Sequence, residues 1–310
     1  MSNIIYAPKS WNPISGCSPI SEGCANCWAK VMARRQRQEW GIVHLHPERL
    51  DQPLHWRKPQ TVAVAFMGDW CHPDVPDKFI DKVFAVMALT PQHTYLLLTK
   101  RPERMRAYLA EPTRVARVDL TTAALVEGKP VRDIEGFVRS VADDATYNPV
   151  WPLPNVWLGV SCENQARADE RIPLLLDTPA AHRWVSLEPL LGAISLRQWL
   201  DIVPAGMPRV FPLAHTAGVS IPSLDWVVIG GESGPHARPC DLGWIRDVRD
   251  QCKAAGVPCY VKQMGSVWAK GDPYDGPPDR RPGQWPDSKG EDWRFWEDDL
   301  RVREMPEGSE

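Results

Sequence analysis

The chain has 310 residues, enough for one large α/β domain or two small ones. With a net charge of -3, 43% apolar and 24% charged residues, its composition is that of an ordinary globular protein and points to neither a nucleic-acid nor a membrane-surface partner. A basic patch on part of the surface remains compatible with this net charge. No apolar run approaches the ~20 residues that span a bilayer. The start, MSNIIYAPKSWNP, lacks the features of a signal peptide, so we expect a cytosolic protein without a membrane partner.

Short apolar runs alternate with segments of helical spacing along most of the chain. Helix formers predict a first helix over residues 28–40. The sequence then predicts strands over residues 61–69, 94–100, 155–161, 183–188, 225–232 and 258–263, and helices over residues 77–89, 102–109, 167–176 and 242–255. Such alternation is typical of right-handed βα units. Since no Gly-x-Gly-x-x-Gly loop is present, it favours an α/β fold with a full or partial (β/α) barrel of about six parallel strands.

We expect a single barrel domain over residues 1–267. The alternation of strands and helices is interrupted near residues 111–154 and 204–222, and we interpret both segments as insertions into βα connections. Residues 268–310 include the stretch DPYDGPPDRRPGQW and are predicted to form an irregular C-terminal extension that packs on the barrel.

Three of the eight cysteines lie in one loop punctuated by glycine and proline. Cys17, Cys24 and Cys27 have the spacing C-x6-C-x2-C, whereas the other five are scattered singly. In a reducing compartment, clustered thiols indicate metal or redox chemistry rather than disulfides. Three thiolates can hold a [4Fe–4S] cluster with one iron open, or zinc with a fourth ligand such as His46 or Cys71. Between these alternatives we favour the cluster.

Polar residues follow nearly every predicted strand. Because parallel barrels carry their chemistry at the carboxyl ends of the strands, we expect these residues to form the rim of a site. For each of them the plainer alternative is a helix cap or turn residue. They are Gly68, Asp69, Lys100, Arg101, Ser161, Glu163, Ser186, Glu188, Gly230, Gly231, Glu232, Lys262 and Gln263.

Some of these strand-end residues are candidates for contact with a substrate. Lys100, Arg101 and Lys262 carry the charge that a substrate phosphate or carboxylate requires, the alternative being rim charges paired with neighbouring acids. Cys71 and Cys162 follow two strand ends and are candidate hydrogen-atom donors. Their plainer interpretation is that of small apolar fillers. With Lys262, they are the candidate catalytic residues.

The sequence resembles a phage-associated family of three-cysteine proteins of unsettled function, which is itself similar to radical S-adenosylmethionine (radical SAM) enzymes. The matching pieces include WNPISGCSPISEGCANCWA, LLLTKRPERM, VSLEPLLG, WVVIGGESG and YVKQMG, and they cover most of the chain outside the two insertions. Radical SAM enzymes usually have the spacing C-x3-C-x2-C. Here six residues separate the first two cysteines, and Asn26 stands where an aromatic residue usually precedes the last.

The resemblance implies an enzyme with two cofactors, a [4Fe–4S] cluster on Cys17, Cys24 and Cys27, and SAM on the open iron. Reductive cleavage of SAM would yield a 5'-deoxyadenosyl radical that abstracts hydrogen from a substrate. The family's association with phage genomes suggests a nucleobase or nucleotide of DNA or RNA as that substrate. An external electron donor is required, and a partner protein is left open.

The resemblance also implies cofactor-binding roles for several strand-end residues. Gly68 and Asp69 correspond to the position that binds the SAM amino group, and Ser161 and Glu163 to the ribose-binding position. By the same resemblance, Gly230, Gly231 and Glu232 would support the adenine or the substrate. Glu188 is a further candidate for contact with a cofactor or the substrate.

Two other functions fit the same residues. The first is a zinc-binding module that interacts with nucleic acid or protein and performs no redox chemistry. The second is a barrel hydrolase in which Asp69, Glu188, Glu232 and Lys262 perform acid–base chemistry while the cysteines are structural.

Overall fold

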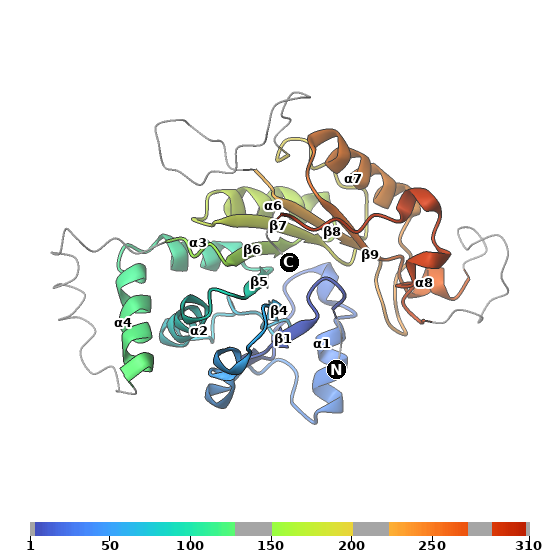
Figure 1. The fold of residues 1–310 in the computed structure, drawn as a ribbon. Helices are drawn as coiled ribbons and strands as arrows, with labels where there is room; N and C mark the ends of the chain where they lie inside the picture. Colours follow the sequence, from blue (N-terminus) through green and yellow to red (C-terminus); the bar gives the residue numbers. More distant parts are fainter. Residues whose placement is uncertain (1–3, 128–150, 201–222, 272–286, 308–310) are drawn as a thin grey trace.

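A computed structural model describes residues 4–127, 151–200, 223–271 and 287–307. A parallel seven-stranded sheet lies at its centre and curls into a half-barrel (Figure 1). Its strands follow one another in chain order: β1 (Lys9–Trp11), β4 (Thr61–Val64), β5 (Thr94–Thr99), β6 (Val156–Ser161), β7 (His182–Leu187), β8 (Trp226–Gly230) and β9 (Cys259–Gln263). The predicted partial barrel is thereby confirmed, with the short strand β1 added to the six predicted strands.

Helices cover the convex face of the sheet. They are α2 (Asp77–Leu89), α3 (Pro102–Ala110), α6 (Gln165–Leu176) and α7 (Leu242–Ala255), with α1 (Trp28–Arg35) and α8 (Ser266–Ala269) outside this layer. The first predicted insertion carries α4 (Arg114–Glu127), which packs on α2. Residues 128–150 of that insertion, and the second insertion, lie outside the described part. None of the described helices has the length and apolar character needed to span a membrane.

Two elements, β4 and α1, end several residues earlier than the sequence predicts, and both end near a residue with left-handed backbone. β4 stops at Val64 because Ala65 has φ 57°, and a turn follows in which the Gly68 N–H donates to the Ala65 carbonyl at 2.9 Å. α1 stops at Arg35 rather than continuing to residue 40, and Arg37 has φ 55°. A non-glycine residue in this region is uncommon and turns the chain away from a regular element.

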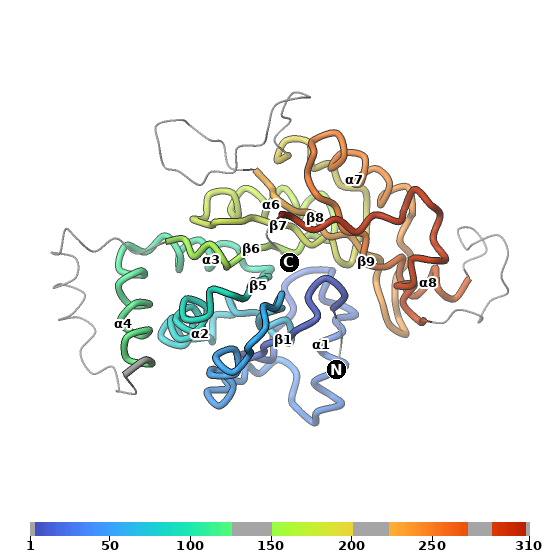
Figure 2. Tube along the Cα trace, viewed as in Figure 1, coloured from blue at the N-terminus to red at the C-terminus, as the bar shows by residue number. Residues whose placement is uncertain are grey.

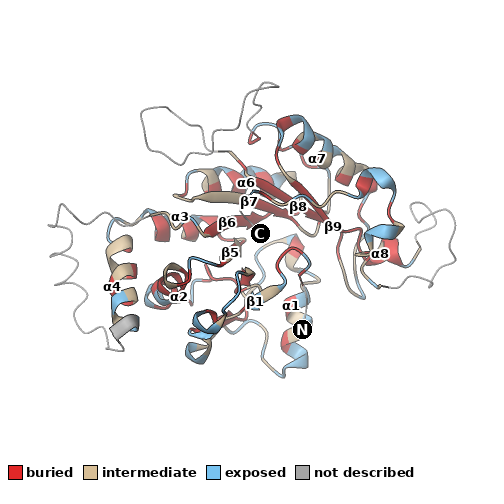
Figure 3. Cartoon of the chain, viewed as in Figure 1, coloured by how far each residue is buried: buried red, intermediate tan, exposed pale blue. Residues whose placement is uncertain are grey.

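The concave face of the sheet is filled by large aromatic side chains. On this face, the amino-terminal halves of the strands carry Trp157, Trp184, Trp226 and Tyr260. Tyr6 from the N-terminal segment packs edge-on against three of these rings. A second apolar cluster fills the space between the sheet and its helices, and Figure 3 shows most of the central strands in the colour of buried residues. The packed interior leaves the carboxyl ends of the strands as the place for a site.

The C-terminal segment covers the open edge of the half-barrel. The Val261 N–H donates to the Val302 carbonyl at 2.8 Å, and the Glu304 N–H donates to the Cys259 carbonyl at 2.9 Å. The chain trace in Figure 2 shows this red segment at β9, while the blue N-terminal part holds β1 at the other end of the sheet. Backbone groups of β9 that would otherwise face solvent are thus paired.

The packing of Trp184 against Gly159 gives a direct test of the inner core. A Cβ atom at Gly159 would lie 2.5 Å from the Trp184 ring, so Gly159→Ala should lower the free energy of unfolding by about 1–3 kcal/mol. Gly192→Ala is the matched control, because its Cβ would meet only an ordinary contact at 3.8 Å. Urea denaturation of both variants measures the difference. Equal stabilities would contradict the described packing.

Candidate functional site

The cysteine loop, residues 17–27, crosses the carboxyl ends of the parallel strands. It begins after β2 (Ile14–Ser15), which pairs with β3 (His44–Leu45) in a separate antiparallel sheet. The Gly16 N–H donates to the Met67 carbonyl at 3.0 Å, which fixes the start of the loop beside the turn after β4. Cys27 caps α1, so the third thiol lies where that helix begins.

The thiols of the cysteine loop face two cations that follow β5. The Arg101 Nη1 donates to Cys17 Sγ at 3.4 Å, and the Lys100 Nζ lies 3.8 Å from Cys24 Sγ. All three loop cysteines are reduced and half-buried. Lys100 and Arg101, which were predicted to bind a substrate anion, therefore point toward thiols of the cysteine loop.

The three thiols differ in their tendency to ionise. Burial, followed by the Asp69 carboxylate, raises the pKa of Cys17 to about 11. Burial also raises the pKa of Cys27. Burial would raise the pKa of Cys24 as well, but the Lys100 ammonium and hydrogen bonds to the sulfur outweigh it, so that the pKa of Cys24 is lowered. Cys24 thus has the thiol that ionises most readily.

Asp69 holds the arginine that contacts Cys17. Its Oδ2 accepts from Arg101 Nη1 at 2.7 Å, and its Oδ1 accepts from the Thr99 hydroxyl at 2.7 Å and from the Cys71 N–H at 2.9 Å. Arg101 also donates to the Ser18 carbonyl at 2.8 Å. Because both carboxylate oxygens are engaged, a ligand amine at Asp69 would have to displace a donor of the chain itself.

The buried side chain of Glu163 holds the middle of the cysteine loop in place. It is fully buried, and its Oε1 accepts from the Gly23 N–H at 3.0 Å. Its Oε2 pairs with the buried Arg171 at 3.0 Å and lies 3.8 Å from Lys100 Nζ. A Cβ at Gly23 would lie within 3.0 Å of both Lys100 and Glu163, so glycine is needed for this close approach.

Glu232 fastens the end of the cysteine loop. Its Oε2 accepts from the Asn26 side chain at 3.1 Å, and Arg238 binds its Oε1 at 2.6 Å. Arg238 also donates to the Glu22 carbonyl at 3.1 Å. Contacts from β5, β6 and β8 therefore converge on a single loop of eleven residues, 17–27.

A second polar cluster lies on the β7–β9 side of the half-barrel. Lys262 Nζ is 2.9 Å from Glu188 Oε1, and the Ser186 hydroxyl donates to Glu188 Oε2 at 3.2 Å. The Tyr6 hydroxyl approaches the same oxygen at 3.4 Å, and burial, followed by the Glu188 carboxylate, raises the pKa of Tyr6. The side chains of Glu188 and Lys262 remain 14% and 19% exposed, and the Glu188 Oε1 that faces Lys262 is itself buried.

The other predicted residues support these two clusters or lie away from them. Ser161 donates to the Glu188 carbonyl at 3.1 Å, and Gly230 leaves room for the Glu188 carboxylate. Gly68 and Gly231 each pack against neighbouring backbone. Cys71 and Cys162 are fully buried in the cluster between sheet and helices, and burial raises the pKa of each. Their thiols do not reach the rim.

Four residues of the site were not among the predicted site residues. Asn26 and Tyr6 contact the strand-end carboxylates of Glu232 and Glu188 from distant parts of the chain. Arg171 and Arg238 instead follow the carboxylates that they bind, those of Glu163 and Glu232, at short distance along the chain. Only Arg171 had a usable signal, since a cation inside the predicted helix that follows Glu163 can turn back toward that carboxylate.

The residues fit a single metal ion poorly. Within the described ranges, no three His, Cys, Asp or Glu side chains come together as ligands of one ion. Both ring nitrogens of His46, considered above as a fourth zinc ligand, already contact Ser15 at 2.8 Å and Glu48 at 3.2 Å. A cluster makes a different demand, because each cysteine binds a separate iron atom and the sulfurs lie further apart.

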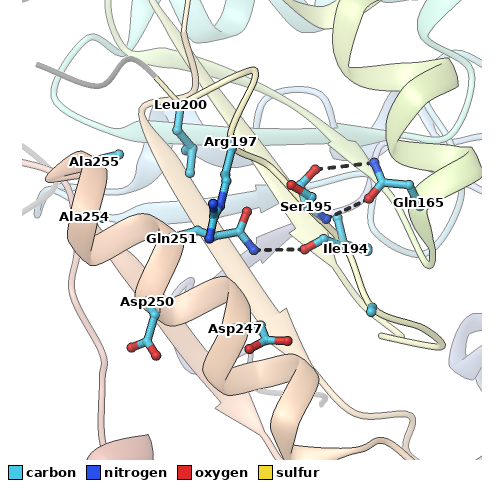
Figure 4. A pocket seen from close by; sticks show the side chains of 11 residues that line it. Gln165, Ile194, Ser195, Arg197, Leu200, Asp247, Asp250, Gln251, Ala254 and Ala255 are labelled. Atoms are coloured by element: carbon cyan, nitrogen blue, oxygen red, sulfur yellow. Dashed lines mark hydrogen bonds between the residues drawn. The ribbon is translucent and has the colours of Figure 1, made fainter.

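A hollow of about 840 Å³ lies on the outer surface between α6 and α7, away from the thiols (Figure 4). Its amide groups are used within the chain: Gln165 accepts from the Ser195 N–H at 2.7 Å, and Gln251 accepts from the Leu196 N–H at 2.6 Å and donates to the Ile194 carbonyl at 3.1 Å. These two side chains clamp one backbone segment to the helices. The other polar residues of its lining are Ser195, Arg197, Asp247 and Asp250, which belong neither to the cysteine loop nor to the strand ends.

The buried charge of Glu163 makes stability depend on pH. Burial would raise the pKa of Glu163, but Lys100, hydrogen bonds and Arg171 outweigh it, so the pKa is lowered below the ~4.3 of an unfolded glutamate. The stabilisation is therefore complete at neutral pH and is lost as the pH falls below about 4. Glu163→Gln should cost about 3 kcal/mol at neutral pH, because Arg171 stays buried without a counter-charge.

Urea denaturation of wild type and Glu163→Gln at neutral pH and at about pH 3 measures this effect, and the difference between them should shrink at the lower pH. Glu170→Gln is the control, since Glu170 pairs with Arg167 at the surface and should change stability by less than about 1 kcal/mol. An equal loss for Glu163→Gln at both pH values would show that its charge contributes nothing.

Comparison with known proteins gives one match. Residues 1–298 match the model of a protein family described as "Protein of unknown function (DUF5131)". The matched range contains the cysteine loop and all seven strands of the half-barrel. No curated protein and no solved structure matches the chain.

Proposed function

The chain belongs to the DUF5131 family, and we propose that it is an iron–sulfur enzyme, similar to radical SAM enzymes, that holds a [4Fe–4S] cluster on Cys17, Cys24 and Cys27. The observation that carries the proposal is the position of the three thiols on one loop across the carboxyl ends of a parallel half-barrel. Parallel barrels use this end for their chemistry. The loop supplies three cysteines, one fewer than the four ligands of a closed zinc shell, and this count suits a cluster with one open iron atom.

The charges around the loop support the same proposal. Cysteine binds iron as the thiolate, so a cluster site must favour negative sulfur atoms. Lys100 and Arg101 supply two positive charges within 3.8 Å of Cys24 and Cys17. Hydrogen bonds and charges at the sulfurs are also the means by which a protein sets the potential of a cluster.

SAM is the second cofactor in this proposal. When bound, the cluster would supply an iron atom open to the amino and carboxylate groups of SAM and an electron for its cleavage. The chain's own residues position the cysteines through Glu163 and Glu232, and Lys100 and Arg101 offset their charge.

The substrate in this proposal is a nucleobase or nucleotide, and Glu188 with Lys262 would receive it. This pair presents an acceptor and a donor side by side, 2.9 Å apart, near aromatic rings. The edge of a nucleobase carries donors and acceptors with the same adjacency. The pair comes from β7 and β9, the two neighbours of β8, and Glu232 after β8 holds the cysteine loop, so a base held there would lie at the same end of the half-barrel as the proposed cluster.

Anaerobic reconstitution with iron and sulfide tests the cluster. Wild type should take up iron and sulfide in equal amounts and develop the broad visible absorption of a cluster, and Cys24→Ala should lose both. Cys252→Ala is the matched control, because Cys252 is a buried thiol on α7 outside the cysteine loop. Stoichiometric zinc uptake without cluster formation would contradict the proposal, as would a Cys24→Ala variant that retains the absorption.

A further inference from the structure

α1 carries a dense group of cations directly after the third loop cysteine. Lys30, Arg34, Arg35 and Arg37 lie within eight residues, and the stretch from residue 23 to residue 38 contains no Asp or Glu. None of the four forms an ion pair with a described residue, and the next acid along the chain is Glu39. In a chain of net charge -3, this is a local reversal of sign.

The same surface exposes large apolar side chains. Trp28 is 37% exposed and Val31 is 43% exposed, one helical turn apart, while Ala29 and Ala33 form the buried side of α1. Four of the eight exposed large hydrophobic residues in the described ranges fall between residues 20 and 42. Figure 3 shows exposed surface along α1 beside the half-barrel. We call Trp28, Lys30, Val31, Arg34, Arg35 and Arg37 the α1 patch.

We propose that the α1 patch binds single-stranded nucleic acid and delivers it to the cysteine loop. Proteins bind single strands by combining cations that follow the phosphates with aromatic rings on which bases stack. Three of the four cations are arginines, whose planar guanidinium groups match phosphate oxygens. Trp28 supplies the exposed ring, and it is joined directly to Cys27.

The chemistry of a base favours a single strand over a duplex. An enzyme that acts on a base must first take it out of the stack, and a single strand offers unstacked bases at the lowest cost. This inference rests on the proposed function and extends it, because the single strand becomes the substrate. Binding to the α1 patch itself requires neither cluster nor SAM.

The spacing of the cations sets an expected salt dependence. From Lys30 to Arg35 the helix advances ~8 Å at the helical rise, and Arg37 follows in the turn after α1, so about three phosphates of one strand can be reached. Each phosphate neutralised on a single strand contributes ~0.7 to the slope of log K against log salt concentration, which predicts a slope of about -2.

Fluorescence anisotropy with a labelled single strand, longer than the ~4–16 nucleotides of a typical site, tests the proposal. DNA and RNA strands of the same sequence are both used, between about 50 and 200 mM salt. The triple variant Arg34→Gln, Arg35→Gln, Arg37→Gln should lose most of the affinity and flatten the slope to about -0.7, the contribution of one phosphate held by the remaining Lys30. Trp28→Ala should weaken binding by about tenfold and leave the slope unchanged, because stacking releases no counterions.

Lys78→Gln with Lys82→Gln on α2 is the matched control, since both lysines are exposed on another helix, and it should bind as wild type does. Cys24→Ala should also bind as wild type does, so a failed cluster assay and a failed binding assay remain distinguishable. The proposal is overturned if wild type does not bind the strands, or if the triple variant binds with the wild-type slope.

Discussion

The buried carboxylate of Glu163 is the constraint on which the position of the thiols depends. A fully buried charge is costly unless it is paired and hydrogen-bonded, and here Arg171, Lys100 and the Gly23 N–H all satisfy it. One of these partners is the backbone of the cysteine loop. The loop is therefore held by a fully buried carboxylate that Arg171 and Lys100 fix in place, which is a stronger restraint than a surface salt bridge would be.

The half-barrel supplies the framework for this restraint. Seven parallel strands bring residues that are far apart in the sequence to one edge, so that Asp69, Glu163 and Glu232 each meet the cysteine loop or the residue that contacts it. The aromatic interior fixes the strands from the concave side, with Trp184 lying against Gly159. Glu188 and Lys262, after the neighbouring strands β7 and β9, form a separate, partly exposed pair. The same rim thus carries the three thiols and a second polar cluster.

Much of this arrangement was predictable from the sequence, because strand position and strand end follow from apolar runs and the residues after them. The roles of the end residues were less predictable. Lys100 and Arg101 face thiols and acids of the chain itself, which depends on how distant segments meet. Cys162 shows the effect of alternation: Ser161 bonds the Glu188 carbonyl on one side of the sheet, and the next residue turns into the helix-facing core. Strand β4 ended early because Ala65 adopts a left-handed conformation that its residue type does not suggest.

In the proposed function, the three loop cysteines leave one iron of a cluster open to SAM. The most direct test is electron paramagnetic resonance of the reduced, reconstituted protein with and without SAM. We expect a reduced-cluster signal whose shape changes when SAM is added, because a ligand to an iron atom alters that cluster's electronic structure. S-adenosylhomocysteine and methionine, added separately, show which part of the molecule is needed. A cluster signal that is the same with and without SAM would contradict an open iron and the radical chemistry built on it.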